Sequence, residues 1–206
     1  MASNSAPVLE ADRSAMTIRD AIDEYVEACE KNSHPPLSEL ISALIERGYE
    51  KSFSNDSYLD ALCLTHVMVE RTVSTMRVLT GGGGSVGFWK TLAKPFNEAA
   101  ARLAKIGGCI QFIVINPIAE CGEVFAEIKK KYPGVFDFVL ANSATPISHF
   151  MICDSRMVRV EEPHEPITLN NPADCIKATV TFKSAELAER YENLFSSLWD
   201  RLKAGK

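Results

Sequence analysis

The sequence predicts a single α/β domain in which a mixed β-sheet lies between helix layers, with an N-terminal helical cap. Three observations predict this class. With 206 residues, 46% of them hydrophobic, the chain can bury one substantial core. From residue 72 onward, strand-like apolar runs and amphipathic helical patterns follow the order βαβαβββα, which is typical of a mixed sheet. No internal repeat is visible, so one such unit is expected.

The N-terminal third of the chain is expected to be helical. Residues 1–16 are rich in Ala, Ser, Asn and Pro, which predicts a flexible N-terminus. Residues 17–71 form the predicted cap, in which Thr17 can cap the first helix and Gly48 suits the position after the second. Helices are expected over residues 17–32, 33–48 and 57–70.

Residues 72–206 are predicted to form the α/β domain itself. Strands are expected over residues 73–80, 109–116, 136–142, 148–154, 157–162 and 176–182. The helices between and after them are expected over residues 88–108, 119–134 and 184–203. The first of these presents an apolar face made of Trp89, Leu92, Phe96, Ala100 and Leu103. The closing helix presents an apolar side made of Leu187, Tyr191, Leu194, Phe195, Leu198 and Leu202.

The composition disfavours several classes of protein. No run approaches the roughly 20 apolar residues of a membrane span, and the N-terminus lacks a signal-peptide pattern, so a soluble cytoplasmic protein without membrane contact is expected. Residues 1–70 carry 13 acidic and 5 basic side chains, a charge of −8, which leaves +3 of the total −5 for residues 71–206. An acidic front end repels a phosphate backbone, so nucleic acid is a disfavoured partner.

Neither the cysteines nor the histidines show the spacing of a metal site. The cysteines are scattered without a CxxC pair, and most lie in apolar segments, so reduced core thiols are expected. They are Cys29, Cys63, Cys109, Cys121, Cys153 and Cys175. The four histidines are equally dispersed. The sequence therefore predicts no metal and no cofactor.

Four features of the second part of the chain share one pattern. A helix opens with Phe88 and Trp89 after a strand and loop, and Gly107 and Gly108 lead into the strand over 109–116. A hairpin over 148–162 and a closing run from Phe182 to Trp199 complete it. From residue 73 to 203 this arrangement resembles a single repeat of the phospholipase D superfamily. The resemblance implies a homodimer, because single-repeat members pair two halves to complete one cleft.

The catalytic motif of that family, HxKxxxxD, does not match. Aligning its Asp on Asp154 puts Ile147 at the His position and His149 at the Lys position. In the other register His149 takes the His position, but Met151 and Arg156 then replace Lys and Asp. Phosphoryl transfer by this route needs both a nucleophile and a cation on the phosphate oxygens. The resemblance therefore implies a degenerate, non-catalytic regulatory, sensor or assembly domain, with His149 and Asp154 as the residues to consider if it is active.

A ligand site is predicted where the parallel strands end, because open α/β sheets bind ligands beyond these ends. Its candidate residues are Gly81, Gly82, Gly83, Gly84, Ser85, Asn116, Asn142, Ser143 and His149. The glycines lie between a strand and a helix N-terminus, where backbone N–H groups favour a small anionic or nucleotide-like ligand. Trp89 before Lys90 excludes a P-loop. The alternatives are a flexible connector, asparagines that form turns, and a buried structural His149.

Other polar groups are expected to be structural. Glu161, Glu162 and His164 are flanked by prolines, which predicts a solvated loop, although acid-base chemistry or a metal is the alternative. Arg156 and Arg159 are expected to form exposed ion pairs near Asp154. Two other functions remain open. One is a dimeric phosphodiesterase or nuclease that uses His149, and the other is a transcription regulator in which residues 17–70 read DNA.

Overall fold

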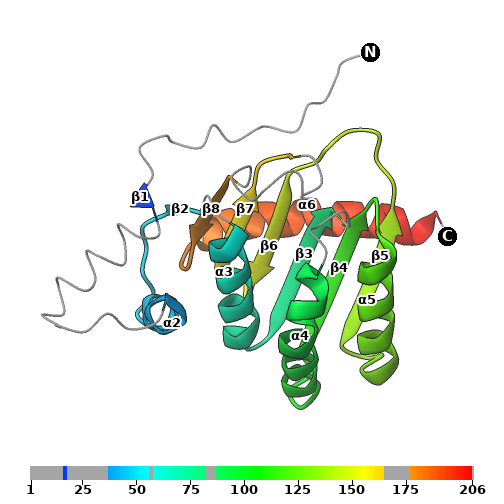
Figure 1. Ribbon diagram of the computed structural model, residues 1–206, viewed down its shortest axis with the longest axis horizontal. Coiled ribbons are helices and arrows are strands. Elements are labelled where there is room, and N and C mark those ends of the chain that lie inside the picture. The colour runs from blue at the N-terminus through cyan, green and yellow to red at the C-terminus, as the bar shows by residue number, and fades with distance from the viewer. Residues whose placement is uncertain (1–15, 18–36, 56–57, 82–86, 165–176, 206) are drawn as a thin grey trace, which may run out of the picture.

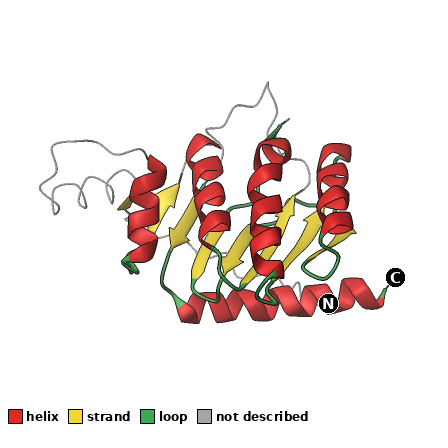
Figure 2. Cartoon of the chain, turned by 90° about the horizontal axis from the view of Figure 1, so that it is seen from below, coloured by secondary structure: helices red, strands yellow, loops and turns green. Residues whose placement is uncertain are grey.

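The computed structural model describes residues 16–17, 37–55, 58–81, 87–164 and 177–205. These residues build one eight-stranded sheet with the strand order β1-β2-β8-β7-β6-β3-β4-β5. The helices within residues 37–131 stand side by side on one face of the sheet, and α6 (Ala185–Ala204) runs along the opposite face (Figures 1 and 2). The predicted class, a mixed sheet between helix layers, is therefore confirmed.

From residue 72 onward, the helices and strands lie close to their predicted positions. All the elements that the structure describes are given below. The strands are β1 (Met16–Thr17), β2 (Phe53–Asn55), β3 (Thr75–Gly81), β4 (Cys109–Ile115), β5 (Phe136–Ala141), β6 (His149–Cys153), β7 (Met157–Glu161) and β8 (Ala178–Thr181). The helices are α2 (Leu37–Glu46), α3 (Tyr58–Arg71), α4 (Phe88–Ala104), α5 (Ala119–Lys131) and α6 (Ala185–Ala204). Among the described residues, none of these helices has the length and apolar character needed to cross a membrane.

One end of the sheet, made of β3, β4 and β5, is parallel, and most of the other strand pairs are antiparallel. β4 pairs in parallel with β3 and β5, whereas β6 runs antiparallel to β3. β6 and β7 form a hairpin whose turn holds Asp154 and Ser155 at positive φ. As a result β3, β4 and β5 end at the same edge of the sheet at which β6 begins. This edge is where the sequence placed its ligand site.

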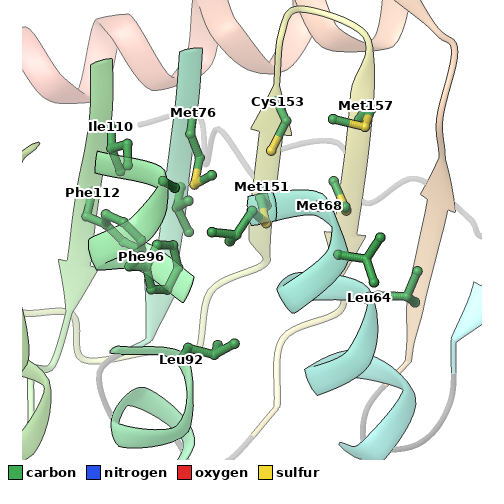
Figure 3. Close-up of a cluster of buried hydrophobic side chains, with 14 of the residues drawn as sticks. Leu64, Met68, Met76, Leu92, Phe96, Ile110, Phe112, Met151, Cys153 and Met157 are labelled. Atoms are coloured by element: carbon green, nitrogen blue, oxygen red, sulfur yellow. The ribbon is translucent and has the colours of Figure 1, made fainter. Parts of the chain in front are cut away.

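The face under α2 to α5 carries the larger part of the core. Trp89 and Phe96 on α4 make edge-to-face contacts with Phe112 on β4, which also touches Phe125 on α5 and Phe136 on β5. In Figure 3, α3 brings Leu64 and Met68 toward Met151 and Met157 on the β6–β7 hairpin. The predicted apolar face of α4 is buried at all five positions, Trp89, Leu92, Phe96, Ala100 and Leu103. Burial of this face is what holds the helix layer on the sheet.

The opposite face is covered by α6. Ser184 caps this helix by accepting the N–H of Leu187 at 3.3 Å. Ala188 and Phe195 are buried against Leu79, Ile113 and other side chains of the sheet. The predicted apolar side was wrong at Leu194, which is 42% exposed. One residue step rotates Leu194 about 100° around the helix from the buried Phe195, whereas Trp199, one turn after Phe195, packs against the sheet.

The described part of residues 17–71 contains α2 and α3, as predicted, and two short strands that the sequence did not predict. β2 pairs with β8, and β1 pairs with β2, so this region extends the sheet. Thr17 is the last residue of β1, an extended conformation that a helix-capping residue also adopts, so its predicted capping role stays a prediction. The helix predicted over 17–32 lies otherwise outside the described residues. Gly48 follows α2 with φ of 62°, the left-handed conformation that its predicted position requires.

Candidate functional site

His149 and Glu161 face each other at the edge where β6 begins and β7 ends. They are direct register partners in the β6–β7 hairpin, and the hairpin's turn fixes that register. The imidazole Nδ1 of His149 lies 3.1 Å from Oε1 of Glu161. The same imidazole lies against the end of β3, since a Cβ added at Gly81 would stand 2.9 Å from its Nε2. His149 is thus held between β7 on one side and β3 on the other.

A second imidazole completes this cluster. His164, three residues after β7, places Nε2 2.6 Å from the same Oε1 of Glu161. The rings of His149 and His164 meet edge to face with centroids 5.0 Å apart. The side chains of His149, Glu161 and His164 are only 16%, 8% and 11% exposed. The predicted solvated loop was therefore wrong for Glu161 and His164, because the hairpin folds both of them into the edge of the sheet.

Arg159 balances the charge of Glu161. Its Nη2 lies 2.5 Å from Oε2 of Glu161, and its Nε donates to Oδ1 of Asn55 on β2 at 3.1 Å. Burial raises the pKa of Glu161, but the Arg159 charge and the hydrogen bonds from both histidines outweigh it and hold this pKa well below its ordinary value. Arg159 is buried, so its predicted exposed ion pair with Asp154 was wrong. Strand alternation places its side chain on the face under α2 to α5, where it pairs with Glu161 and Asn55, while Asp154 binds the backbone before β3.

Of the other predicted site residues, Asn116, Asn142 and Ser143 follow the neighbouring strands β4 and β5 at the same edge. Asn116 follows β4 at φ 52° and exchanges two 2.9 Å hydrogen bonds with the backbone of Ser143, which follows β5. Asn142 is exposed. The stretch from Gly82 to Ser85 lies outside the described residues. The assignment of all these residues to one ligand site stays a prediction.

A carboxylate of the protein already caps the N-terminus of α4, where the sequence suggested an anion. The backbone N–H of Gly87 donates to both oxygens of Glu120, at 3.1 and 3.3 Å. Lys90 lies 3.7 Å from the same carboxylate. Glu120 stands in the first turn of α5, so it joins two neighbouring helices at their N-termini. This carboxylate takes the electrostatic role that an anionic ligand would have there.

Asp154 lies at the far end of β6 from His149. Its carboxylate accepts the backbone N–H groups of Val73, Ser74 and Thr75 at 2.7 to 3.2 Å, so it fastens the hairpin turn to the entry of β3. Five residues at about 3.3 Å each separate it from His149 by about 16 Å. Ile147, which one of the two sequence alignments places at the family's His position, packs against the apolar cluster under α6.

The described cysteines are free thiols. Burial raises the pKa of Cys121 and of Cys153 to about 12, and it also raises the pKa of Cys63 and Cys109. A thiol with a raised pKa carries little thiolate at neutral pH and is a poor nucleophile. These four residues behave as the small core hydrophobes that the sequence predicted, while Cys29 and Cys175 lie outside the described residues.

Comparison with solved structures identifies the fold. Nuc from Salmonella typhimurium, a phospholipase D family member, superposes with a TM-score of 0.50 at 14% identity, over 73% of this chain and 95% of Nuc. The chain has a phospholipase D-like fold. The resemblance seen in the sequence is thereby confirmed at the level of the fold.

TrmBL2, an archaeal chromatin protein whose structure shows a novel mode of DNA binding, superposes with a TM-score of 0.54 at 16% identity. The match covers 89% of this chain and 65% of TrmBL2, so the chain spans about two-thirds of that protein's length. No protein-family model matches the sequence, and no curated protein matches it. At these identities the phospholipase D-like fold is what the likeness shows.

Proposed function

We propose that this domain is a non-catalytic phospholipase D-like regulatory or sensor module that binds a small anionic or nucleotide-like ligand. The positions of the motif residues around β6 carry the proposal. Ile147 packs under α6, His149 contacts Glu161, and Asp154 binds the backbone before β3. Each of the three contacts another part of the fold. In the register that aligns Asp154, Ile147 and His149 stand in place of the His and Lys that the motif needs for chemistry. A nucleophile and a phosphate-binding cation are therefore both missing from the motif.

The edge at which β3 ends and β6 begins is the proposed ligand site. Strand ends of an open α/β sheet gather polar groups from several strands, and ligands bind outside them. Here His149 is fixed beside Gly81, and Asn116 and Ser143 hold the adjoining strand ends together. A preformed polar edge lowers the entropic cost of binding, because its side chains are already ordered.

Titration calorimetry with a panel of nucleotides and phosphate esters tests the ligand. Gly81→Ala should weaken binding by at least about tenfold, because its Cβ would press on the His149 imidazole at 2.9 Å. Gly122→Ala on α5 is the matched control, since its Cβ would meet open space and binding should not change. If no compound binds, or if both variants bind like the wild type, the edge is not a ligand site and an assembly role is the better description.

A phosphodiesterase is the second candidate, and one observation favours it. Glu161 contacts Nδ1 of His149, an arrangement that can orient the other ring nitrogen as a nucleophile. Purified protein should not hydrolyse bis(p-nitrophenyl) phosphate, phosphatidylcholine or single-stranded DNA above background. Hydrolysis that disappears in His149→Ala would replace our proposal with this enzyme.

Binding of DNA is a third possibility, suggested by the likeness to TrmBL2, whose structure shows DNA binding. The charge of −8 over residues 1–70 argues against it, since a protein must neutralise phosphates to hold a duplex. A gel-shift titration with duplex DNA at low salt should show no complex at micromolar protein. A salt-sensitive complex would instead support a nucleic-acid function.

A further inference from the structure

We infer that His149, Glu161 and His164 form a zinc-binding site at the edge of the sheet beside Gly81. These three side chains are the ones that the described residues bring together as a group of possible metal ligands, with all ligand atoms within 4.8 Å of one another. The zinc assignment goes beyond the proposed function and is independent of it. The additional inference that zinc supplies the positive charge for an anionic ligand rests on the proposed function.

The distances already approach those of a metal site. A tetrahedral zinc ion with bonds of about 2.0–2.1 Å holds its ligand atoms about 3.3 Å apart. Oε1 of Glu161 lies 3.1 Å from Nδ1 of His149 and 2.6 Å from Nε2 of His164. Small rotations of these side chains are therefore enough to admit an ion. All three are largely buried, which restricts the freedom that binding would otherwise have to remove.

The ligand atoms favour a first-row transition metal over calcium or magnesium. Two imidazole nitrogens and one carboxylate oxygen suit zinc and its neighbours in the first transition row, whereas calcium and magnesium require more oxygen ligands. Three protein ligands also leave one position of a tetrahedral zinc ion open. Water or a small anion would complete the coordination there.

Arg159 and Asn55 orient the carboxylate of Glu161 through the oxygen that does not face the imidazoles. Arg159 contacts Oε2 of Glu161, so it leaves Oε1 to the two imidazoles, and Asn55 holds the guanidinium in place. Groups that hydrogen-bond to a metal ligand fix its orientation and tune the site. The Arg159 charge opposes a cation, and this repulsion is offset by the paired charge of Glu161.

A bound ion would also supply the positive charge that an anionic ligand needs at the proposed site. The N-terminus of α4 is already capped by Glu120, and Arg159 is paired with Glu161. Neither leaves an unpaired positive charge for a ligand. A zinc ion with an open position would provide that charge at the same edge, next to the end of β3.

Equilibrium dialysis of the metal-free full-length chain against zinc chloride, followed by metal analysis, tests the site directly. The wild type should bind one zinc ion per chain, and His149→Gln and His164→Gln should each weaken binding by at least about tenfold. His66→Gln is the matched control, because His66 lies on the exposed surface of α3 with one carboxylate partner, Glu70 at 3.1 Å. Circular dichroism checks that each variant is folded.

A second measurement does not depend on the variants. Cobalt added to the metal-free wild type should give the visible absorption of a tetrahedral nitrogen- and oxygen-ligated ion, and zinc should displace it. Absence of zinc binding at micromolar concentrations, or zinc binding unchanged in both histidine variants, would overturn the inference. Anion binding is measured separately on chelator-treated and zinc-loaded protein. Zinc binding without anion binding would contradict the proposed function alone, and the reverse result would contradict the zinc site alone.

Discussion

Several carboxylates in this protein each bind more than one partner. Glu161 gathers two imidazoles and a guanidinium at one end of the β6–β7 hairpin, and Asp154 gathers three backbone N–H groups at the other. Asp137 on β5 binds Lys129 of α5 and Lys203 of α6 at 2.5 and 2.7 Å. Asp154 and Asp137 connect elements that are distant in the sequence, which makes their charges relevant to stability.

The pH dependence of stability should reveal the role of Asp137. Burial raises the pKa of Asp137, but hydrogen bonds from Lys129 and Lys203 lower it below its ordinary value. A depressed pKa contributes stability that is present above the unfolded pKa of about 3.9 and is lost as the pH falls through the folded pKa. Asp137→Asn should thus cost up to about 1 kcal/mol at pH 7, a modest amount because the carboxylate is partly exposed.

Urea unfolding at several pH values between 7 and 2 measures this effect. The difference in free energy of unfolding between wild type and Asp137→Asn should shrink below about pH 4, where the carboxyl groups become protonated in the unfolded chain. Glu98→Gln serves as the control, since its partner Lys94 at 3.8 Å lies with it on the exposed surface of α4. A difference that stays constant down to pH 2 would show that the two lysines do not stabilise the Asp137 carboxylate.

At the scale of elements, α6 is the helix that covers the second face of the sheet. Helices α2 to α5 share one face of the sheet, whereas α6 runs along the other (Figure 2). Its contacts reach β3, β5, β6 and β7, so it joins the parallel and antiparallel parts of the sheet. Loss of a buried side chain on α6 should therefore destabilise the whole domain.

Phe195→Ala tests this role of α6. Phe195 is 1% exposed and stacks on Trp199, and truncating a buried phenylalanine costs about 3–5 kcal/mol. Leu194→Ala is the control on the same helix, since Leu194 is 42% exposed and should cost less than about 1 kcal/mol. Denaturant unfolding gives both values. Equal costs at the two positions would mean that α6 does not pack against the sheet as described.

At the scale of the molecule, the described residues form one phospholipase D-like unit. This unit covers 95% of Nuc, so the two proteins match over nearly the whole of the smaller fold. The expectation that two copies pair comes from the family resemblance and stays a prediction. Pairing would also determine whether the edge beside Gly81 faces solvent or a second copy.

Size-exclusion chromatography with light scattering tests the homodimer. At micromolar concentration the mass should be about twice the 22.7 kDa of the chain. Dilution into the nanomolar range should return the monomer if the interface is of moderate size. A strict monomer at micromolar concentration would contradict the predicted dimer.

The sequence by itself determined the order of the elements, the helix faces and the phospholipase D-like resemblance. The order of the elements and the helix faces follow from local periodicity, because strands alternate every two residues and helices every three to four. The buried face of α4 and the two strands of the hairpin over residues 148–162 were predicted in this way. The resemblance rests instead on the motifs found between residues 73 and 203. The two-residue β1 and three-residue β2 were missed, since such short strands carry no periodicity and form only by pairing with the edge of an existing sheet.

Only the tertiary structure decided what surrounds His149. Its partner Glu161 is 12 residues away, and His164 is three residues farther along the chain, so neither showed a metal-ligand spacing. The hairpin register, extended from Cys153 opposite Met157 back to His149 opposite Glu161, was the signal that could have found the pair. The neighbours of Arg159 and of the α4 N-terminus depended in the same way on which strands and helices lie side by side. Contacts between distant segments, and the burial that strengthens them, arise from packing, and local sequence patterns do not encode them.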